Sequence, residues 1–197
     1  MEFYEKYGTD FSKSRFRIWP HVKMFLQSLP AGAKVLDIGC GNGKNMDVRR
    51  DLSMIGLEQS SVLCKICAVK GLSVVQGDAR SLPFSNNSFD AVIMIAVIHH
   101  LAPEDQLRAL FEIQRVLVPH GKAMITCWAV EQPPTARRKF VRGHNLVTWH
   151  GHEEAPLSYW VQDENDTKEF VKALPTGLRA IQIVWNAGNW NYVLEKL

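Results

Sequence analysis

The chain lacks an apolar run long enough to cross a lipid bilayer. Its longest such stretch extends only from Ala91 to Ile98, whereas a membrane-spanning helix needs about 18 or more apolar residues. The first twenty residues carry charges throughout, unlike the apolar segment of a secretory signal. We therefore expect no membrane partner and an intracellular protein, located in the cytoplasm with the nucleus as the alternative.

The chain is also poor in metal ligands at metal-binding spacing. It has four cysteines, of which only Cys64 and Cys67 are spaced as a metal-binding pair. A zinc site needs about four ligands, and no second close pair follows. We expect no metal and interpret this pair as small apolar residues on a helix.

Strands alternate with helices along the 197 residues, a length that fits one domain with its own core. This alternation predicts an α/β fold with a doubly wound, mostly parallel sheet, and the last two strands predict a C-terminal antiparallel hairpin. We predict a leader and a substrate-side helix over residues 1–30 and an irregular insertion over residues 129–160, which have no clear period. Predicted strands cover residues 34–38, 54–57, 73–76, 89–95, 122–128, 180–185 and 190–194, and predicted helices cover 20–29, 60–70, 103–116 and 167–174.

The net charge of +3 is unevenly distributed along the chain. Residues 13–23 and 135–144 contain several basic side chains and no acid, whereas acids dominate residues 153–169. Two basic clusters suggest a polyanionic ligand, and solvated surface charge is an equally good explanation.

A glycine-rich loop follows the first predicted strand. Residues 35–43 read Val-Leu-Asp-Ile-Gly-Cys-Gly-Asn-Gly, and Glu58, which ends the second strand, follows Gly39 by 19 residues. A strand, glycines and a distant acid together are typical of a nucleoside-binding site. Asp37, two residues before the first glycine, would repel a pyrophosphate and suits a ligand with a cationic amino-acid group.

Acids end successive strands, where ligands of open α/β sheets bind. We expect Glu58 to bind both ribose hydroxyls and Asp78 and Ala79 to lie at the adenine, while a helix after the glycines offers N–H groups to a carboxylate. A surface or capping role is the alternative for any one of these acids. The glycine run resembles motif I of the S-adenosylmethionine-dependent methyltransferases, which implies a single class I domain with a seven-stranded Rossmann-like sheet and S-adenosyl-L-methionine as the cofactor. The cofactor-binding residues implied are Asp37, Gly39, Cys40, Gly41, Gly43, Glu58, Gln59, Asp78, Ala79 and Ile95.

Segments outside this core carry a narrower resemblance. The leader from Phe11 to Pro20, the pair His99-His100, the run Cys127 to Gln132 and the ending Gly188 to Trp190 together resemble the eukaryotic tRNA methyltransferases that esterify 5-carboxymethyluridine at the wobble position. The resemblance implies that Arg15 and His100 hold the acceptor carboxylate or a nearby phosphate, and that Trp19 and His99 shape the pocket. For the anticodon loop, the candidate phosphate contacts are Arg137, Arg138, Lys139 and Arg142, and the candidate stacking platforms are Phe16, Trp19, Phe140 and Trp149.

The same resemblance implies a heterodimer with a small zinc-binding methyltransferase activator protein. This partner would pair with the sheet edge at the third strand, Leu72 to Gln76, although a self-associating edge would have the same sequence features. Two other functions remain open from the residues alone. One is a methyltransferase for a small molecule such as a quinone precursor or an organic acid, among which paired histidines are also common. The other is a cofactor-binding scaffold without turnover.

Overall fold

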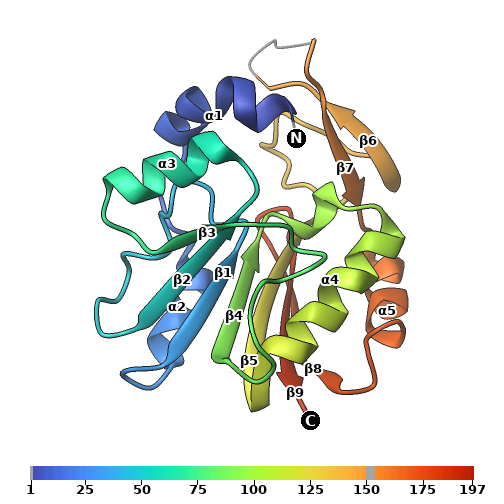
Figure 1. Ribbon diagram of the computed structural model, residues 1–197. Helices are drawn as coiled ribbons and strands as arrows, with labels where there is room; N and C mark the ends of the chain where they lie inside the picture. Colours follow the sequence, from blue (N-terminus) through green and yellow to red (C-terminus); the bar gives the residue numbers. More distant parts are fainter. Residues whose placement is uncertain (1, 150–153) are drawn as a thin grey trace.

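A computed structural model describes residues 2–149 and 154–197 (Figure 1). Its centre is a seven-stranded sheet in the order β3-β2-β1-β4-β5-β9-β8. The strands from β3 to β5 pair in parallel, and β9 pairs antiparallel with both β5 and β8. The predicted doubly wound sheet and C-terminal hairpin are therefore confirmed. The strands of this sheet are β1 Lys34–Ile38, β2 Ser53–Glu58, β3 Val74–Gln76, β4 Phe89–Ile95, β5 Leu117–Trp128, β8 Leu178–Asn186 and β9 Asn189–Lys196.

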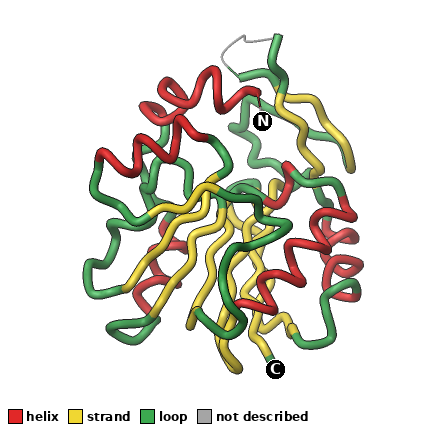
Figure 2. Tube along the Cα trace, in the orientation of Figure 1, coloured by secondary structure: helices red, strands yellow, loops and turns green. Residues whose placement is uncertain are grey.

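Helices cover both faces of the sheet (Figure 2). In β1, Leu36 packs in the apolar cluster formed with α4 and α5, whereas the adjacent Val35 packs in the cluster formed with α2. Strands covered on both faces are expected to be apolar, as β4 is from Ala91 to Ile95. None of the described helices is long and apolar enough to span a membrane. The helices are α1 Glu2–Ser14, α2 Pro20–Ser28, α3 Ser61–Val69, α4 Pro103–Val116 and α5 Glu164–Lys172, with a 3₁₀ turn, η1, at Ile98–His100.

The prediction of a helix after the glycine loop is wrong. Residues 39–52 form turns only, and Gly39, Gly41 and Gly43 have φ values of 66°, 59° and 75°. Three left-handed residues in alternation cannot belong to a right-handed helix. The connection then buries Met46 and Leu52 in two different apolar clusters before β2 begins, so the chain is held by side-chain packing instead of helical hydrogen bonds.

The prediction of an irregular segment over residues 129–160 is also wrong in part. Strands β6 Gly143–Val147 and β7 Leu157–Val161 pair antiparallel in a separate two-stranded sheet. The alternating burial of β7 is visible in its sequence, but β6 buries only Val147 and leaves Leu146 68% exposed. The apolar residues of this sheet pack against α1 in a third cluster. Because the helix that covers this sheet lies at the other end of the chain, the local sequence shows little of the pattern expected for a strand.

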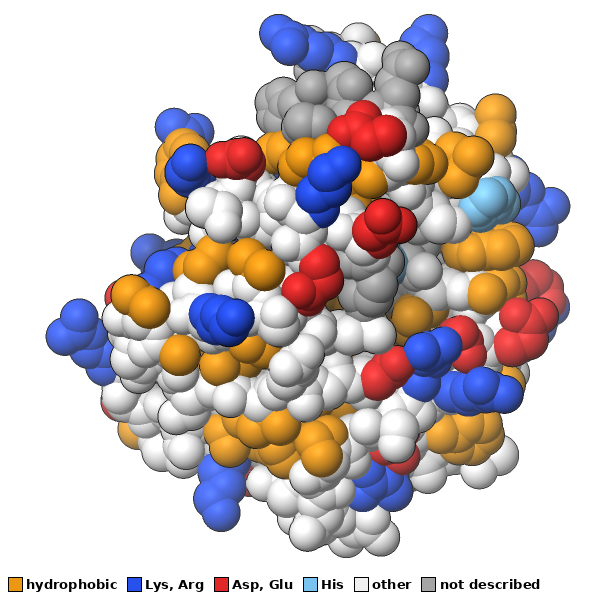
Figure 3. All heavy atoms as spheres, turned by 45° about the horizontal axis from the view of Figure 1, so that its top comes forward, with side chains coloured by type: hydrophobic (Ala, Val, Ile, Leu, Met, Phe, Trp, Pro, Cys, Tyr) orange, Lys and Arg blue, Asp and Glu red, His pale blue; other side chains and the backbone are white. Residues whose placement is uncertain are grey.

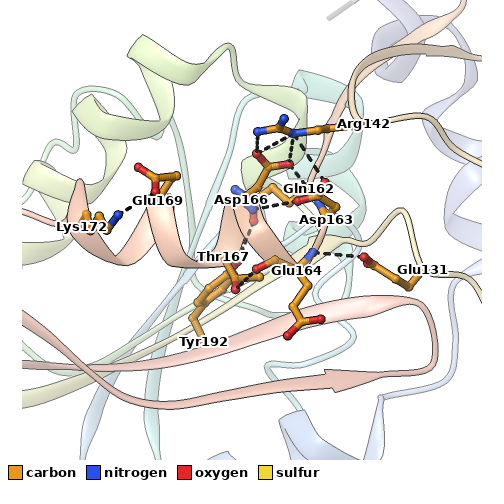
Figure 4. Close-up of polar contacts among 10 residues, drawn as sticks. All are labelled: Glu131, Arg142, Gln162, Asp163, Glu164, Asp166, Thr167, Glu169, Lys172 and Tyr192. Carbon is orange, nitrogen blue, oxygen red and sulfur yellow. Dashed lines mark hydrogen bonds and ion pairs between the residues drawn. The ribbon is translucent and has the colours of Figure 1, made fainter.

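Helix α5 begins three residues earlier than the predicted start at residue 167 (Figure 4). Asp163 accepts a hydrogen bond from the Asp166 N–H at 2.8 Å, and Asp166 accepts one from the Asp163 N–H at 3.0 Å. This reciprocal arrangement is a capping box. Its third position usually holds Glu or Gln, and the shorter aspartate here explains why the sequence did not indicate this start.

The packing of α2 against the sheet predicts the effect of a mutation. Leu26 is fully buried, whereas Met24 on the same helix is 69% exposed. We expect Leu26→Ala to lower the free energy of unfolding by about 2–5 kcal/mol, because it leaves a cavity in the α2 cluster. Met24→Ala is the control and should change it by less than about 0.5 kcal/mol. Equilibrium unfolding in urea measures both values, and equal losses would contradict this assignment of the buried face.

Candidate functional site

A cavity of about 760 Å³ opens at the carboxyl ends of β1, β2 and β4. Its wall combines the glycine loop, the end of β2 and the turn after β3 with α1, η1 and β7, so segments far apart in sequence meet there. Asp37 and Gly43 do not line it. The remaining predicted cofactor residues do: Gly39, Cys40, Gly41, Glu58, Gln59, Asp78, Ala79 and Ile95.

Asp37 lies behind the cavity wall. It is 1% exposed, and burial raises its pKa to about 8. The Asn45 amide donates to one of its oxygens at 3.4 Å, and the other has no partner among the described residues. Asn45 itself lines the cavity, and its own buried carbonyl oxygen has no described partner. Sequence reasoning missed Asn45, which lines the cavity directly in front of the buried Asp37.

Gly43 faces protein instead of the cavity. A Cβ at this position would lie 2.2 Å from Cδ1 of Leu72 and 3.3 Å from the sulfur of Cys67. Its left-handed backbone and this close approach together require glycine. The third glycine therefore serves the packing of the loop against α3 and the turn that follows it.

Glu58 is buried, and its carboxylate binds the loops around it. It accepts hydrogen bonds from the N–H groups of Gly41, Gln59 and Ser60, each at 2.9 Å. Burial raises its pKa, and these hydrogen bonds oppose that shift because they favour the charged form. A carboxylate has about four acceptor positions, so Glu58 retains capacity for a ligand hydroxyl while it holds the two loops together.

Asp78 stands at the end of β3 in a salt bridge with Arg80. The guanidinium Nη2 lies 2.6 Å from Asp78 Oδ2, and this contact holds the pKa of Asp78 below its usual range. Arg80 also binds Asp105 on α4 at 2.8 Å. Asp78 is therefore a fixed, ionised acceptor beside the cavity.

The paired histidines carry no positive charge at neutral pH. Burial lowers the pKa of His100 to about 4 and that of His99 well below its usual range. His100 Nε2 shares a hydrogen bond of 3.1 Å with the Tyr4 hydroxyl, and its ring lies 4.8 Å from that of Tyr159. These residues form an aromatic wall that can offer hydrogen bonds to a ligand but no ionic attraction.

Arg15 and Trp19 line the cavity from the linker between α1 and α2. The Asn42 side chain donates to the carbonyl groups of Ser12 and Arg15 at 3.0 and 2.9 Å. The glycine loop thereby fixes the linker that presents Arg15. Lys44, which sequence reasoning also missed, lines the same cavity with its Nζ 5.5 Å from the Trp19 ring centre.

The predicted phosphate contacts fall into two groups. Arg137 and Lys139 are exposed, and Arg138 donates a hydrogen bond to the Thr148 carbonyl. Arg142 instead forms ion pairs with Asp166 and Asp163 at the start of α5 (Figure 4). The basic side chains of the upper face form separate groups and not one continuous patch (Figure 3).

The prediction of stacking platforms is wrong for two residues. Phe140 and Trp149 are 8% and 6% exposed and pack with α1 in the third apolar cluster. Both are held there by apolar contacts, and neither presents a free ring face to RNA. Phe16, in contrast, is 71% exposed and lines the cavity next to Arg17, whose guanidinium lies over its ring.

The predicted partner edge and the cysteine pair both lie near α3 and β3. Strand β3 is the edge strand, and Val75 and Gln76 are exposed on it. Cys64 and Cys67 lie on α3, where Cys67 is fully buried. Among the described residues, no three histidine, cysteine, aspartate or glutamate side chains are arranged to hold a metal.

Comparison with known proteins relates the chain to methyltransferases. Residues 36–125 match the family model described as a methyltransferase domain. The tRNA (carboxymethyluridine(34)-5-O)-methyltransferase ALKBH8 of Macaca fascicularis is 43% identical over 145 residues, covering 73% of this chain and 22% of that protein. The tRNA (carboxymethyluridine(34)-5-O)-methyltransferase of Schizosaccharomyces pombe is 42% identical over 137 residues, covering 69% of this chain and 60% of that protein. The chain thus spans less than two thirds of the length of these curated relatives. The predicted family resemblance is confirmed.

A solved structure shows that the fold is shared over the whole chain. The methyltransferase in complex with the Trm112 methyltransferase activator of Haloferax volcanii superposes with a TM-score of 0.72 at 20% identity. The match covers 98% of this chain and 97% of that one. At this identity, the likeness concerns the fold alone.

The raised pKa of Asp37 predicts a pH-dependent stability of the ligand-free protein. Its carboxyl titrates near 3.8 when unfolded and at about 8 when folded. Between these values the folded state binds the extra proton, so the free energy of unfolding falls as the pH rises, by roughly 1.4 kcal/mol per pH unit at most. Asp37→Asn cannot ionise and should flatten this decline. Urea unfolding between pH values of about 5 and 8 measures it, and parallel curves for the two proteins would refute the assignment.

Proposed function

We propose that the chain is a class I S-adenosylmethionine-dependent methyltransferase and that it methylates the carboxylate of 5-carboxymethyluridine at the tRNA wobble position. The product is the methyl ester. The observation that carries this proposal is a single cavity in which the glycine loop and Glu58 face Arg15 and the histidine pair. The sequence identity of 43% and 42% to two carboxymethyluridine methyltransferases supports the choice of acceptor.

The residues of the cavity fit S-adenosylmethionine, which supplies an electrophilic methyl group on a sulfonium when bound. Glu58 retains an acceptor position for a ribose hydroxyl, and Asp78 and Ala79 border the position for the base. Asn45 lines the cavity where the ammonium group is expected, and Asp37 stands behind it. An ammonium placed there would favour the ionised form of Asp37.

The proposed reaction needs no general base. A carboxylic acid with a pKa of roughly 4 is already an anion at neutral pH, so its oxygen can attack the methyl carbon directly. Placement of the acceptor, exclusion of water and charge complementarity must then supply the catalysis. The neutral His99 and His100 are consistent with this, since a proton acceptor is not required at the acceptor position.

Recognition of RNA is assigned to basic and aromatic side chains around the cavity. Arg137, Arg138 and Lys139 are the proposed phosphate contacts, and Phe16 is a platform on which an unstacked base can lie. Arg142 is not included because two carboxylates already bind it. The wobble base must leave its stack to reach the cavity.

We further propose that a small zinc-binding activator protein pairs with the edge strand β3 at Leu72 to Gln76. An exposed edge with apolar side chains invites the addition of a strand from a partner. Val75 is 37% exposed on this edge, and Val69 at the end of α3 is 89% exposed. A structural neighbour of this chain forms a complex with a Trm112 methyltransferase activator, which supports a small activator partner here.

The proposed activity predicts the chemistry of the product. With labelled cofactor, the activator protein and tRNA that lacks only the terminal methyl group, label should enter a wobble nucleoside whose ester is cleaved by mild alkali. Nucleoside analysis by mass spectrometry, before and after alkali, makes the measurement. A product stable to alkali would contradict esterification. Efficient methylation of small organic acids without RNA would favour the small-molecule alternative, and cofactor binding without any turnover would favour a scaffold.

The proposed phosphate contacts predict a salt-dependent weakening of RNA binding. We expect the double variant Arg137→Glu, Arg138→Glu to weaken tRNA binding and to lower the slope of log affinity against log salt by about 0.7–0.9 for each phosphate that is no longer neutralised. Cofactor affinity should not change. Arg142→Gln is the control and should retain the RNA affinity and slope of the wild type. Filter binding over a salt series measures both, and an unchanged slope in the double variant would exclude this surface.

A further inference from the structure

Two cations face the cavity from adjacent segments. Lys44 follows the left-handed Gly43 and places its Nζ 5.5 Å from the Trp19 ring centre. The guanidinium carbon of Arg15 lies 4.8 Å from the ring centre of Phe11. Burial lowers the pKa of Lys44, and the positive charge of Arg15 lowers it further, so the two cations lie within electrostatic range of each other.

The acids of the cavity wall do not neutralise this pair. Asp37 would attract the Lys44 charge when ionised, but it lies behind the wall with a pKa of about 8, so it is mostly protonated at neutral pH in the ligand-free protein. Glu58 is engaged by backbone N–H groups, and Asp78 by a neighbouring arginine.

The remaining acids and the histidines also do not neutralise the positive charge of Arg15 and Lys44. Glu2 and Glu154 line the cavity but are exposed, and Glu154 pairs with Lys6. Within residues 2–149 and 154–197, neither Arg15 nor Lys44 forms an ion pair with a carboxylate within 4.0 Å. His100 is neutral and supplies no charge. Two partly buried cations that no described carboxylate neutralises make this part of the cavity attractive to an anion.

We propose that Lys44 and Arg15 together form a carboxylate-binding site for the methyl acceptor, and that Lys44 makes the enzyme prefer a carboxymethyl group over its uncharged amide. This inference rests on the proposed function, in which Lys44 would select an acceptor with a negative charge. Arg15 provides a planar pair of donors, and Lys44 provides a compact charge. The two cations would hold one oxygen of the carboxylate and leave the other free to form the bond to the methyl carbon, as the bond between that carbon and the sulfonium sulfur breaks.

The aromatic rings explain why these side chains suit the role. A cation over an aromatic face is attracted by the ring quadrupole, so Trp19 and Phe11 hold Lys44 and Arg15 in place before the acceptor arrives. Side chains that are already held lose less freedom on binding. Asn42 fixes the backbone that carries Arg15 by binding its carbonyl group at 2.9 Å, so both cations are supported from the glycine loop.

The location of Arg15 favours the acceptor over the methionine carboxylate of the cofactor. The guanidinium of Arg15 lies over the Phe11 ring, whose centre is 5.1 Å from that of Tyr4, and the Tyr4 hydroxyl shares a hydrogen bond with His100 in the aromatic wall. This wall belongs to α1, η1 and β7, and none of these three elements is part of the glycine loop. A carboxylate between Arg15, Lys44 and the aromatic wall therefore lies on the acceptor side.

The test compares two short anticodon stem-loop RNAs that differ in one group, a 5-carboxymethyluridine and a 5-carbamoylmethyluridine at the wobble position. The full chain with its activator should bind the acid form more tightly than the amide form. Lys44→Met should weaken binding of the acid by at least about tenfold, as expected when a charge-assisted hydrogen bond is removed, and leave binding of the amide unchanged. Lys44→Arg should restore most of the preference.

Controls separate the acceptor site from other roles. Lys23→Met removes an exposed lysine of α2 and should leave both affinities unchanged. Calorimetric binding of S-adenosylmethionine and of its decarboxylated analogue identifies the carboxylate concerned. If Lys44→Met weakens only the binding of the carboxylate-bearing cofactor and retains the preference for the acid RNA, the site belongs to the cofactor and the proposal fails.

The result is informative even if the activity proposed above is wrong or a variant does not fold. If the wild type prefers the acid RNA but forms no ester, the proposed reaction fails while the carboxylate site stands. If the wild type binds the acid and the amide equally, the site itself is refuted. If Lys44→Met does not fold, Arg15→Gln must show the same selective loss, and an unchanged preference in that variant also refutes the site.

Discussion

The buried carboxylate of Glu58 is the group on which the arrangement of the cavity depends. It binds the N–H of Gly41 in the loop after β1, and those of Gln59 and Ser60 after β2. A charged acceptor with several N–H donors is a strong link, and it sets the separation of two loops that must both touch one ligand. Ser60 extends the link, since its hydroxyl accepts from the α3 backbone and donates to the Tyr4 carbonyl. One acid thereby positions the glycine loop, α3 and α1.

The parts of the fold that local sequence determines were predictable, and the parts that depend on distant partners were not. The parallel strands are apolar on both faces, and the acids at their ends fall where the sheet requires ligand contacts, so Glu58 and Asp78 could be placed from sequence. Asn45 and Lys44 carry no such signal, because nothing local shows that the turn after Gly43 returns to the cavity. Strand β6 was missed because its partner lies further along the chain and its cover, α1, lies at the other end.

The charge of the cavity was the property that the sequence predicted least well. A count of basic residues cannot tell that Arg142 is bound by two carboxylates, or that burial leaves His99 and His100 neutral. The same burial keeps Asp37 mostly protonated, so the positive field of Arg15 and Lys44 remains. The sign of the field in the cavity therefore depends on which groups are desolvated, and only the packing of α1, the linker and β7 determines that.

The two ends of the described chain differ in their relation to this cavity, which matters for how the protein is handled. Glu2 lines the cavity, whereas β9 runs to Lys196 at the opposite end of the sheet (Figure 1). A purification tag or fluorophore attached before residue 2 would stand at the entrance, where it could compete with a bulky acceptor. The same label attached after Leu197 would project from the far side. Immobilisation through the C-terminal end is therefore the arrangement that leaves the entrance free.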